Sequence, residues 1–191
     1  MSSAGWMVTT MADEALMGAV EAEYRQVYAR HVTEAWAANE SLPITTRYYR
    51  DDPPWKIFLL LTPWMLARLF FAGDEPVGFA PRLPLPVDGG SPDEGAQLFQ
   101  LGPVVSFALH GQPQKGHMQW SAGLGHFLLQ PLILNMAPYV GAESAFAAWS
   151  DTVARRDALL STMKRNCGWQ KEVSRRELFG RGIGNRSDRH C

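Results

Sequence analysis

The chain has 191 residues, of which 46% are hydrophobic and 19% are charged, and its formal net charge is -1. This composition is typical of a globular domain and excludes an intrinsically disordered chain. No apolar run reaches the roughly 18–20 residues that a membrane-spanning helix needs, and we find no signal-peptide pattern near the start. Two cysteines, Cys167 and Cys191, form neither a disulfide framework nor a metal-binding pair, so we expect a reducing, cytoplasmic location.

The charge is unevenly distributed along the chain. Residues Arg155–Cys191 include ten basic and four acidic residues, a net charge of +6, so the rest of the chain carries -7. Three interpretations are open: docking onto an acidic protein or onto the chain's own body, a solvated tail, or nucleic-acid binding. We expect no nucleic-acid partner, because the domain as a whole is not basic and no aromatic residues interleave with the arginines.

Hydrophobic periodicity and turn residues predict the elements of the first half. They are a helix over Asp13–Ala38, strands over Ile44–Tyr49 and Trp55–Leu61, and a short helix over Trp64–Phe71. Asp51–Pro54 reads as the turn between the two strands. Thr62 and Pro63 suit the start of the short helix, because Thr is a good N-cap and Pro fits the first helical position.

The second half continues with strands and ends in a second amphipathic helix. The expected elements are a loop over Gly78–Gly95, strands over Gln97–Leu101, Val104–His110 and His117–Leu124, and a helix over Ala142–Arg165. The hairpin loop is expected over Gly111–Gly116, and Pro131 leaves Phe127–Met136 ambiguous. This order predicts an α+β fold, an antiparallel β-sheet meander with an N-terminal helix and a long C-terminal helix packed on one face. We expect a flexible leader (1–12), a single domain (13–182) and a flexible basic tail (183–191).

The sequence contains no GxSxG, Walker A, HExxH or GxGxxG motif, so we expect no catalytic residues, no resident cofactor and no enzyme activity. Three histidines, His110, His117 and His126, are close in sequence and could converge around a hairpin as a zinc or iron site. The alternative is that they are ordinary residues of loops and strand ends, since no carboxylate or cysteine nearby completes a ligand set. A metal- or small-molecule-binding protein is therefore the second hypothesis.

Two segments point to a known family. Leu61–Leu66 reads LTPWML after an apolar strand, and Arg175–Arg181 reads RRELFGR near the end of the chain. In this order and spacing they resemble the HybE/HupJ/HoxT family of [NiFe]-hydrogenase assembly chaperones, over roughly Glu21–Arg181. The stretch from Gly78 to Gly141 is less similar, and the chain lacks the cysteine pairs of the rubredoxin domain that is fused to some relatives.

The resemblance implies a cytoplasmic accessory protein without catalytic activity. Its partner would be a hydrogenase subunit precursor, the Fe–S small subunit with its twin-arginine signal, held until cofactor insertion and subunit pairing are complete. The large subunit and other maturation proteins are further partners, and an apolar docking surface allows a weak homodimer. The candidate apolar docking residues are Pro63, Trp64, Met65, Leu69 and Phe70, and a second, charged anchor comprises Arg175, Arg176, Phe179 and Arg181. Each segment has a structural alternative, the first as part of the core and the second as a clamp on the tail.

Overall fold

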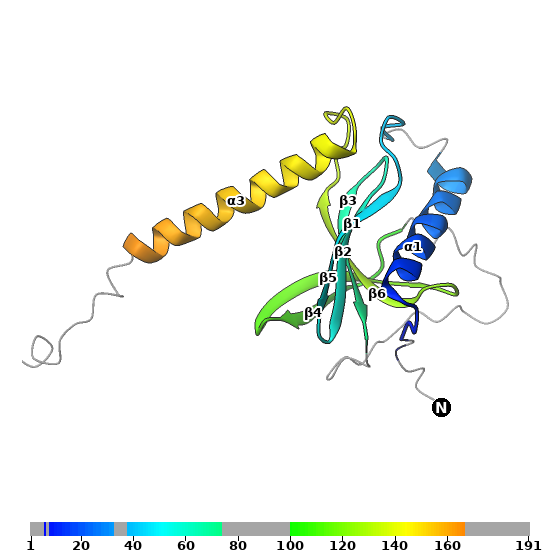
Figure 1. The fold of residues 1–191 in the computed structure, drawn as a ribbon, viewed down its shortest axis with the longest axis horizontal. Coiled ribbons are helices and arrows are strands. Elements are labelled where there is room, and N and C mark those ends of the chain that lie inside the picture. The colour runs from blue at the N-terminus through cyan, green and yellow to red at the C-terminus, as the bar shows by residue number, and fades with distance from the viewer. Residues whose placement is uncertain (1–5, 7, 33–37, 74–99, 167–191) are drawn as a thin grey trace, which may run out of the picture. The chain divides into compact units, whose positions relative to one another are not determined.

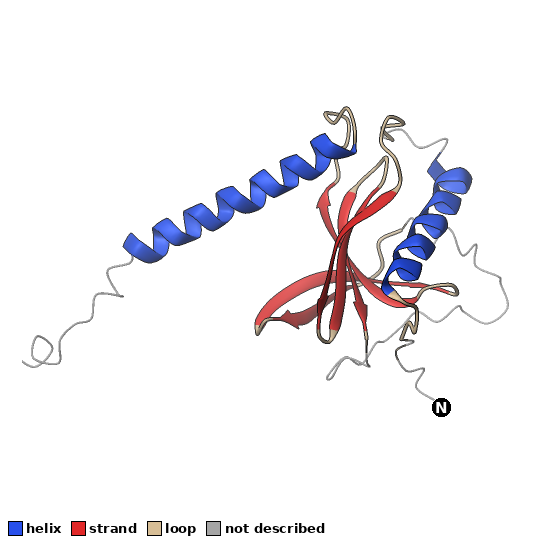
Figure 2. Ribbon diagram, viewed as in Figure 1, coloured by secondary structure: helices blue, strands red, loops and turns tan. Residues whose placement is uncertain are grey.

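The computed structural model of the chain describes residues 6, 8–32, 38–73 and 100–166. These residues form a six-stranded antiparallel sheet and two longer helices, α1 (Asp13–Val27) and α3 (Ala142–Asn166) (Figures 1 and 2). A π-helix, Tyr28–Val32, directly follows α1. The predicted α+β class is confirmed. The chain divides into two compact units, Met1–Trp149 and Ser150–Cys191.

The sheet consists of two three-stranded meanders joined side by side. Its strands are β1 (Thr45–Asp52), β2 (Trp55–Leu61), β3 (Leu66–Ala72), β4 (Val104–Leu109), β5 (Gln112–Ser121) and β6 (Gly125–Ile133). Their order is β1-β2-β3-β6-β5-β4, and every neighbouring pair is antiparallel. The pairing of β3 with β6 therefore joins the two meanders at the centre of the sheet, and β1 and β4 form its edges.

The segment Trp64–Phe71 differs from its prediction as a short helix. Most of it belongs to strand β3, which lies between β2 and β6 and is buried on both faces. A strand covered on both faces has a continuous apolar sequence, and over so few residues such a run does not distinguish a strand from a buried helix. Thr62 and Pro63 accordingly open the turn between β2 and β3 instead of capping a helix.

The second meander also differs in detail from its prediction. The β4–β5 hairpin turns over His110 and Gly111, whose φ angles of 51° and 72° are typical of a two-residue type I′ turn. Strand β5 therefore begins at Gln112. The hairpin loop expected over Gly111–Gly116 is replaced by this two-residue turn. Pro131 is accommodated in β6 because the pairing of β6 with β5 ends at Leu129, so that no hydrogen bond to β5 is required of the proline nitrogen.

Some expected elements lie outside the described residues. They are the loop Gly78–Gly95, the tail 183–191 and most of the strand predicted over Gln97–Leu101. Gln100 and Leu101, the described end of that segment, are not in a strand. The helix predicted over Ala142–Arg165 is confirmed as α3.

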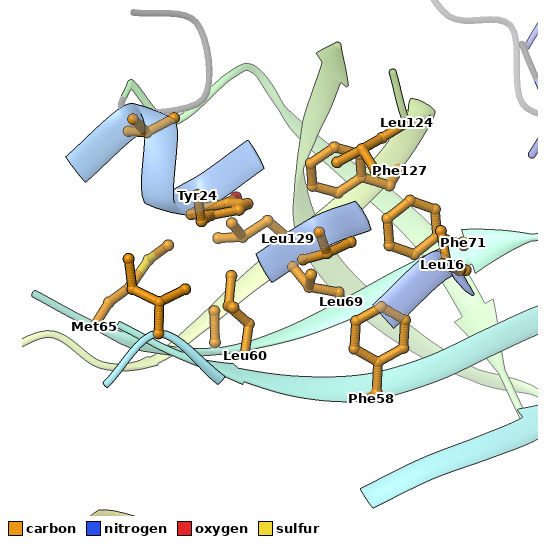
Figure 3. Close-up of a cluster of buried hydrophobic side chains, with 14 residues drawn as sticks. Leu16, Tyr24, Phe58, Leu60, Met65, Leu69, Phe71, Leu124, Phe127 and Leu129 are labelled. Carbon is orange, nitrogen blue, oxygen red and sulfur yellow. The ribbon is translucent and has the colours of Figure 1, made fainter. Parts of the chain in front are cut away.

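The larger hydrophobic core lies between α1 and one face of the sheet (Figure 3). In α1, Leu16, Val20, Tyr24 and Val27 recur at steps of three and four and are at most 1% exposed. They pack against alternate side chains of three strands, which are Phe58 and Leu60 of β2, Ala67, Leu69 and Phe71 of β3, and Phe127 and Leu129 of β6. The apolar side chains that recur about every 3.6 residues along the helix and every 2 residues along the strands thus pack together in one core.

A half-buried polar contact fixes α1 to the edge of the sheet. The Glu21 carboxylate accepts hydrogen bonds from the backbone N–H and hydroxyl of Thr46 in β1, at 2.8 and 2.9 Å, and from Arg25 at 2.7 Å. Burial raises the pKa of Glu21, but the hydrogen bonds from Thr46 and Arg25 outweigh burial, so the pKa lies below its usual value. The contact also occupies an edge N–H that could otherwise pair with another strand.

The opposite face of the sheet carries two smaller clusters. One contains Leu59, Leu61 and Leu66 from the strands together with Ala145 and Phe146 from the first turns of α3. The other contains Trp55, Ile57, Phe70, Met118 and Leu128 from the sheet interior, Phe107 from β4, and Trp6. The first turns of α3, through Ala145 and Phe146, therefore pack on the face of the sheet opposite α1, whereas we expected both helices on a single face.

The sheet coils until its edge strand β4 meets the β1–β2 hairpin. The indole N–H of Trp55 donates to the carbonyl oxygen of Ala108 at 3.4 Å, and His110 Nε2 lies 2.9 Å from the carboxylate of Asp52. This coiling encloses the second small cluster, in which Trp6 is 6% exposed. Trp6 lies within the leader that we expected to be flexible, and its large apolar surface is the physical reason for its burial.

Candidate functional site

The candidate site is built on the turn Thr62–Met65, which connects β2 to β3. The N–H of Thr62 donates to the carbonyl oxygen of Met65 at 2.9 Å, and the N–H of Met65 donates to Thr62 Oγ1 at 3.0 Å. The hydroxyl of Thr62 is therefore an internal brace of the turn, and Thr62 is fully buried. This hydrogen bonding fixes the backbone of Pro63 and Trp64 at the end of two core strands.

Trp64 takes part in a short stack of aromatic rings. Its ring lies parallel to that of Tyr28, with an interplanar angle of 3° and centroids 6.0 Å apart, and its centroid is 6.4 Å from that of Tyr24. Tyr24 is fully buried, whereas Trp64 and Tyr28 are each half-buried. We call the half-buried pair, Trp64 and Tyr28, the aromatic shelf.

The π-helix positions one side of this shelf. Tyr24 belongs to α1, and Tyr28 is the first residue of the π-helix that follows it. The wider turn of a π-helix interrupts the regular α-helical spacing, and such segments recur at functional sites. Periodicity extended the predicted helix to Ala38 and gave no signal for this change. Tyr28 was therefore missed as a candidate site residue.

Asn39 connects three loops, one of which is the turn that carries Trp64. Its backbone N–H donates to the carbonyl oxygen of Pro63 at 2.7 Å, and its side-chain amide donates to the carbonyl oxygens of Met136 and Tyr139 at 2.9 and 2.7 Å. Its side-chain oxygen accepts hydrogen bonds from the N–H and hydroxyl of Ser41. From the sequence, Asn39 is a plausible helix stop. This bridging role was not evident because two of its partners, Met136 and Tyr139, are 97 and 100 residues away.

The other candidate docking residues support the shelf from within. Pro63 is buried, and Met65, Leu69 and Phe70 are at most 3% exposed. Leu69 belongs to the core beneath α1, and Phe70 belongs to the cluster with Trp6 on the opposite face. Of the five apolar candidates, Trp64 alone reaches the surface. The charged anchor, Arg175, Arg176, Phe179 and Arg181, lies outside the described residues.

The three histidines do not converge on a common point. His110 is exposed at the hairpin turn, where it contacts Asp52, and His117 Nδ1 donates to the carbonyl oxygen of Gly102 at 2.8 Å. His126 is 3% exposed with its ring 5.4 Å from that of Trp6, and burial lowers the pKa of its imidazole.

His117 and His126 also face opposite sides of the sheet. His117 is paired with Leu129, which lies three residues from His126 on the same strand, and side chains alternate along a strand. Among the described residues, no group of three or more His, Cys, Asp or Glu side chains is arranged to hold a metal. The geometry thus contradicts the three-histidine metal site, because the predicted loop is a tight turn and the strands carry the rings apart.

A second set of aromatic contacts holds the start of α3. The guanidinium group of Arg47 pairs with Glu143 at 2.6 Å and lies 4.9 Å from the ring centroid of Phe146. The guanidinium of Arg68 lies 5.7 Å from the ring centroid of Trp149. These contacts are explained by anchoring of the start of the helix to the sheet.

A rigid turn that presents a half-buried tryptophan beside a tyrosine is typical of a protein-binding surface, because such rings bury a large area at a low entropy cost. The fold and site therefore define an α+β protein whose turn Thr62–Met65 presents a half-buried tryptophan beside a half-buried tyrosine. No helix among the described residues is long and apolar enough to span a membrane.

Comparison with known proteins identifies the family. The model of the family described as "[NiFe]-hydrogenase assembly, chaperone, HybE" matches residues 15–181, and the chain belongs to this family. The fold is similar to that of the solution structure of HybE from Escherichia coli, with a TM-score of 0.52 and 11% sequence identity over 98% of this chain and 93% of that chain. No curated protein matches the chain by sequence. The family resemblance expected from LTPWML and RRELFGR is confirmed.

Proposed function

We propose that this protein binds the precursor of a [NiFe]-hydrogenase small subunit, with its twin-arginine signal still attached, in the cytoplasm. It holds the precursor until cofactor insertion and subunit pairing are complete, and it catalyses no reaction itself. The observation that carries this proposal is the family match over residues 15–181. The large subunit and other maturation proteins are further partners of the same kind.

The aromatic shelf is the proposed first contact with the precursor. Trp64 and Tyr28 have fixed orientations because the Thr62 brace and the α1–π-helix junction hold them, so little entropy is lost when they bind. Met65, Leu69 and Phe70 act indirectly, by packing the strand that carries the turn. Arg175, Arg176, Phe179 and Arg181 are proposed as a second, charged contact.

An affinity pull-down from the native cytoplasm, with mass spectrometry of the bound proteins, tests the proposal. The expected result is recovery of a hydrogenase small-subunit precursor with its signal peptide intact. Recovery of no hydrogenase subunit, from cells shown to be making hydrogenase, would contradict it. Light scattering of the purified chain reports whether the shelf instead joins two copies as a weak homodimer.

Two substitutions test whether the aromatic shelf contacts the precursor. Trp64→Ala should weaken precursor binding by about tenfold or more, since tryptophan is a frequent hot-spot residue in interfaces. Trp120→Ala is the matched control, because Trp120 is also a half-buried tryptophan but lies on β5. Circular dichroism confirms that both variants are folded. Equal losses in the two variants would remove the shelf from the proposal.

A further inference from the structure

Strand β4 is an edge of the sheet, and its pairing with β5 fixes which of its backbone groups point outward. The residues that flank a two-residue hairpin turn, here Leu109 and Gln112, exchange backbone hydrogen bonds with each other. In the same alternation, the N–H of Met118 donates to the carbonyl oxygen of Pro103 at 2.9 Å. The odd-numbered residues of β4 therefore bond to β5, and the even-numbered residues direct their N–H and C=O groups away from it.

Two of these outward residues, Val104 and Ser106, are available for pairing. The third, Ala108, already accepts a hydrogen bond from the indole N–H of Trp55 at 3.4 Å. Among the described residues, Val104 and Ser106 have no such partner on the outward side. Val104 is also 59% exposed, and Leu101, three residues earlier, is 43% exposed, so apolar surface accompanies these backbone groups. Groups arranged in this way pair with another extended strand.

The other edge of the sheet, β1, is protected against such pairing. The N–H of Thr46 donates to the carboxylate of Glu21 at 2.8 Å, and a register shift between Arg47 and Arg50 interrupts the strand. The sequence of β1, TTRYYRDD, is also rich in charged residues, whereas that of β4, VVSFAL, contains no charge and no proline, and its pairing has no register shift. Charged side chains and bulges keep edge strands from pairing, so β4 is the edge suited to it.

We infer that two copies of this chain pair through their β4 strands, antiparallel, about a twofold axis at Val105. The N–H of Ser106 in each copy donates to the carbonyl oxygen of Val104 in the other, and the N–H of Val104 donates to the carbonyl oxygen of Ser106. The two Val105 side chains lie directly opposite each other, which is a favourable cross-strand pair. Because β4 is uncharged, its two copies bring no like charges together.

This register and this copy number follow from the contacts at the two edges. A register shifted to an axis at Ser106 would pair Val104 with Ala108, whose carbonyl oxygen Trp55 already engages. The joined sheet has β1 at both of its ends, because β1 and β4 are the two edges of each copy. The protected β1 edges therefore stop the assembly at two copies. The aromatic shelf takes no part in the contact.

The test compares Ser106→Pro with Ser106→Ala in the full chain, by sedimentation velocity over a range of protein concentrations. Proline lacks the N–H that points away from β5, so the pairing of β4 with β5 is retained while the donor to the second copy is lost. Alanine keeps that N–H and is the matched control. Ser106→Pro should raise the Kd of the dimer about tenfold or more, whereas Ser106→Ala should stay within about threefold of the wild-type chain. Circular dichroism checks that both variants are folded.

Amide hydrogen exchange of the wild-type chain tests the same contact without a substitution, in case Ser106→Pro does not fold. The amides of Val104 and Ser106 should exchange more slowly as the protein concentration rises, because the dimer buries them. Fast exchange at every concentration would show that no strand pairs there. Slow exchange at every concentration would show that the chain covers this edge itself. Either result overturns the inference.

The oligomeric state decides the remaining cases. A wild-type chain that stays monomeric at every concentration overturns the inference, and so does a dimer that a folded Ser106→Pro variant leaves intact. A dimer that Trp64→Ala dissociates belongs to the aromatic shelf and overturns it as well. The pull-down of the precursor reports on the proposed function separately, because pairing through β4 requires no precursor.

Discussion

Leu69 and Phe70 are neighbours in β3, and both are fully buried although they face opposite sides of the sheet. Truncation of Leu69 should therefore leave a cavity in the core beneath α1, and truncation of Phe70 a cavity in the cluster with Trp6 on the opposite face. By the usual cost of such cavities, Leu69→Ala should lower the free energy of unfolding by about 3 kcal/mol and Phe70→Ala by about 4 kcal/mol. With a urea m-value of about 2 kcal/mol/M, the unfolding midpoints fall by about 1.5 and about 2 M.

Urea unfolding followed by circular dichroism measures both changes, and Leu159→Ala provides the matched control. Leu159 is 65% exposed, so removal of its side chain should change the free energy of unfolding by less than about 0.5 kcal/mol. A helix over this segment would bury one of two adjacent residues much more than the other. If only one of the two variants is destabilised, the central strand and the reasoning from it are wrong.

Two further predictions concern α1. Because the folded-state pKa of Glu21 lies below the usual 4.5, its carboxylate stabilises the fold above that pH, and this contribution is lost as the pH falls through 4.5 towards the folded-state pKa. The difference in unfolding free energy between wild type and Glu21→Gln should therefore shrink between pH 7 and pH 3, and a constant difference would refute the assignment. Tyr24 is fully buried, and its hydroxyl makes no hydrogen bond to a described residue. Tyr24→Phe should accordingly be neutral or stabilising by up to about 1 kcal/mol in urea unfolding, and a clear loss of stability would reveal a partner for the hydroxyl.

A substitution at the site could impair chaperone function in two ways, and the burial of the substituted residue decides which one applies. A change at Trp64 or Tyr28 alters a partly exposed surface, whereas a change at Leu69 or Phe70 lowers the amount of folded protein. Binding should therefore be expressed per folded molecule. On that basis Leu69→Ala should bind the precursor as tightly as the wild-type chain does, although its abundance in cells falls.

The sequence alone identified the family and the elements that depend on local signals. The 3.6-residue spacing of Leu16, Val20 and Tyr24 predicted α1, and the apolar run Ile57–Leu61 after two prolines predicted β2. The LTPWML segment includes Trp64, and its role as a docking surface stays a prediction. These features were predictable because propensity, periodicity and turn residues act between neighbours in the chain.

Only the tertiary structure decided which apolar residues face solvent and which face the core. Residues 66–71 became a strand because β2 and β6 supply hydrogen bonds on both sides, and the same pairing buries Leu69 and Phe70. Trp6 is buried because the sheet coils around it, Asn39 bridges loops through partners far along the chain, and Tyr28 meets Trp64 through a change in helix type. None of these contacts has a local sequence signal, since each depends on pairing between segments whose separation in the chain carries no periodic pattern.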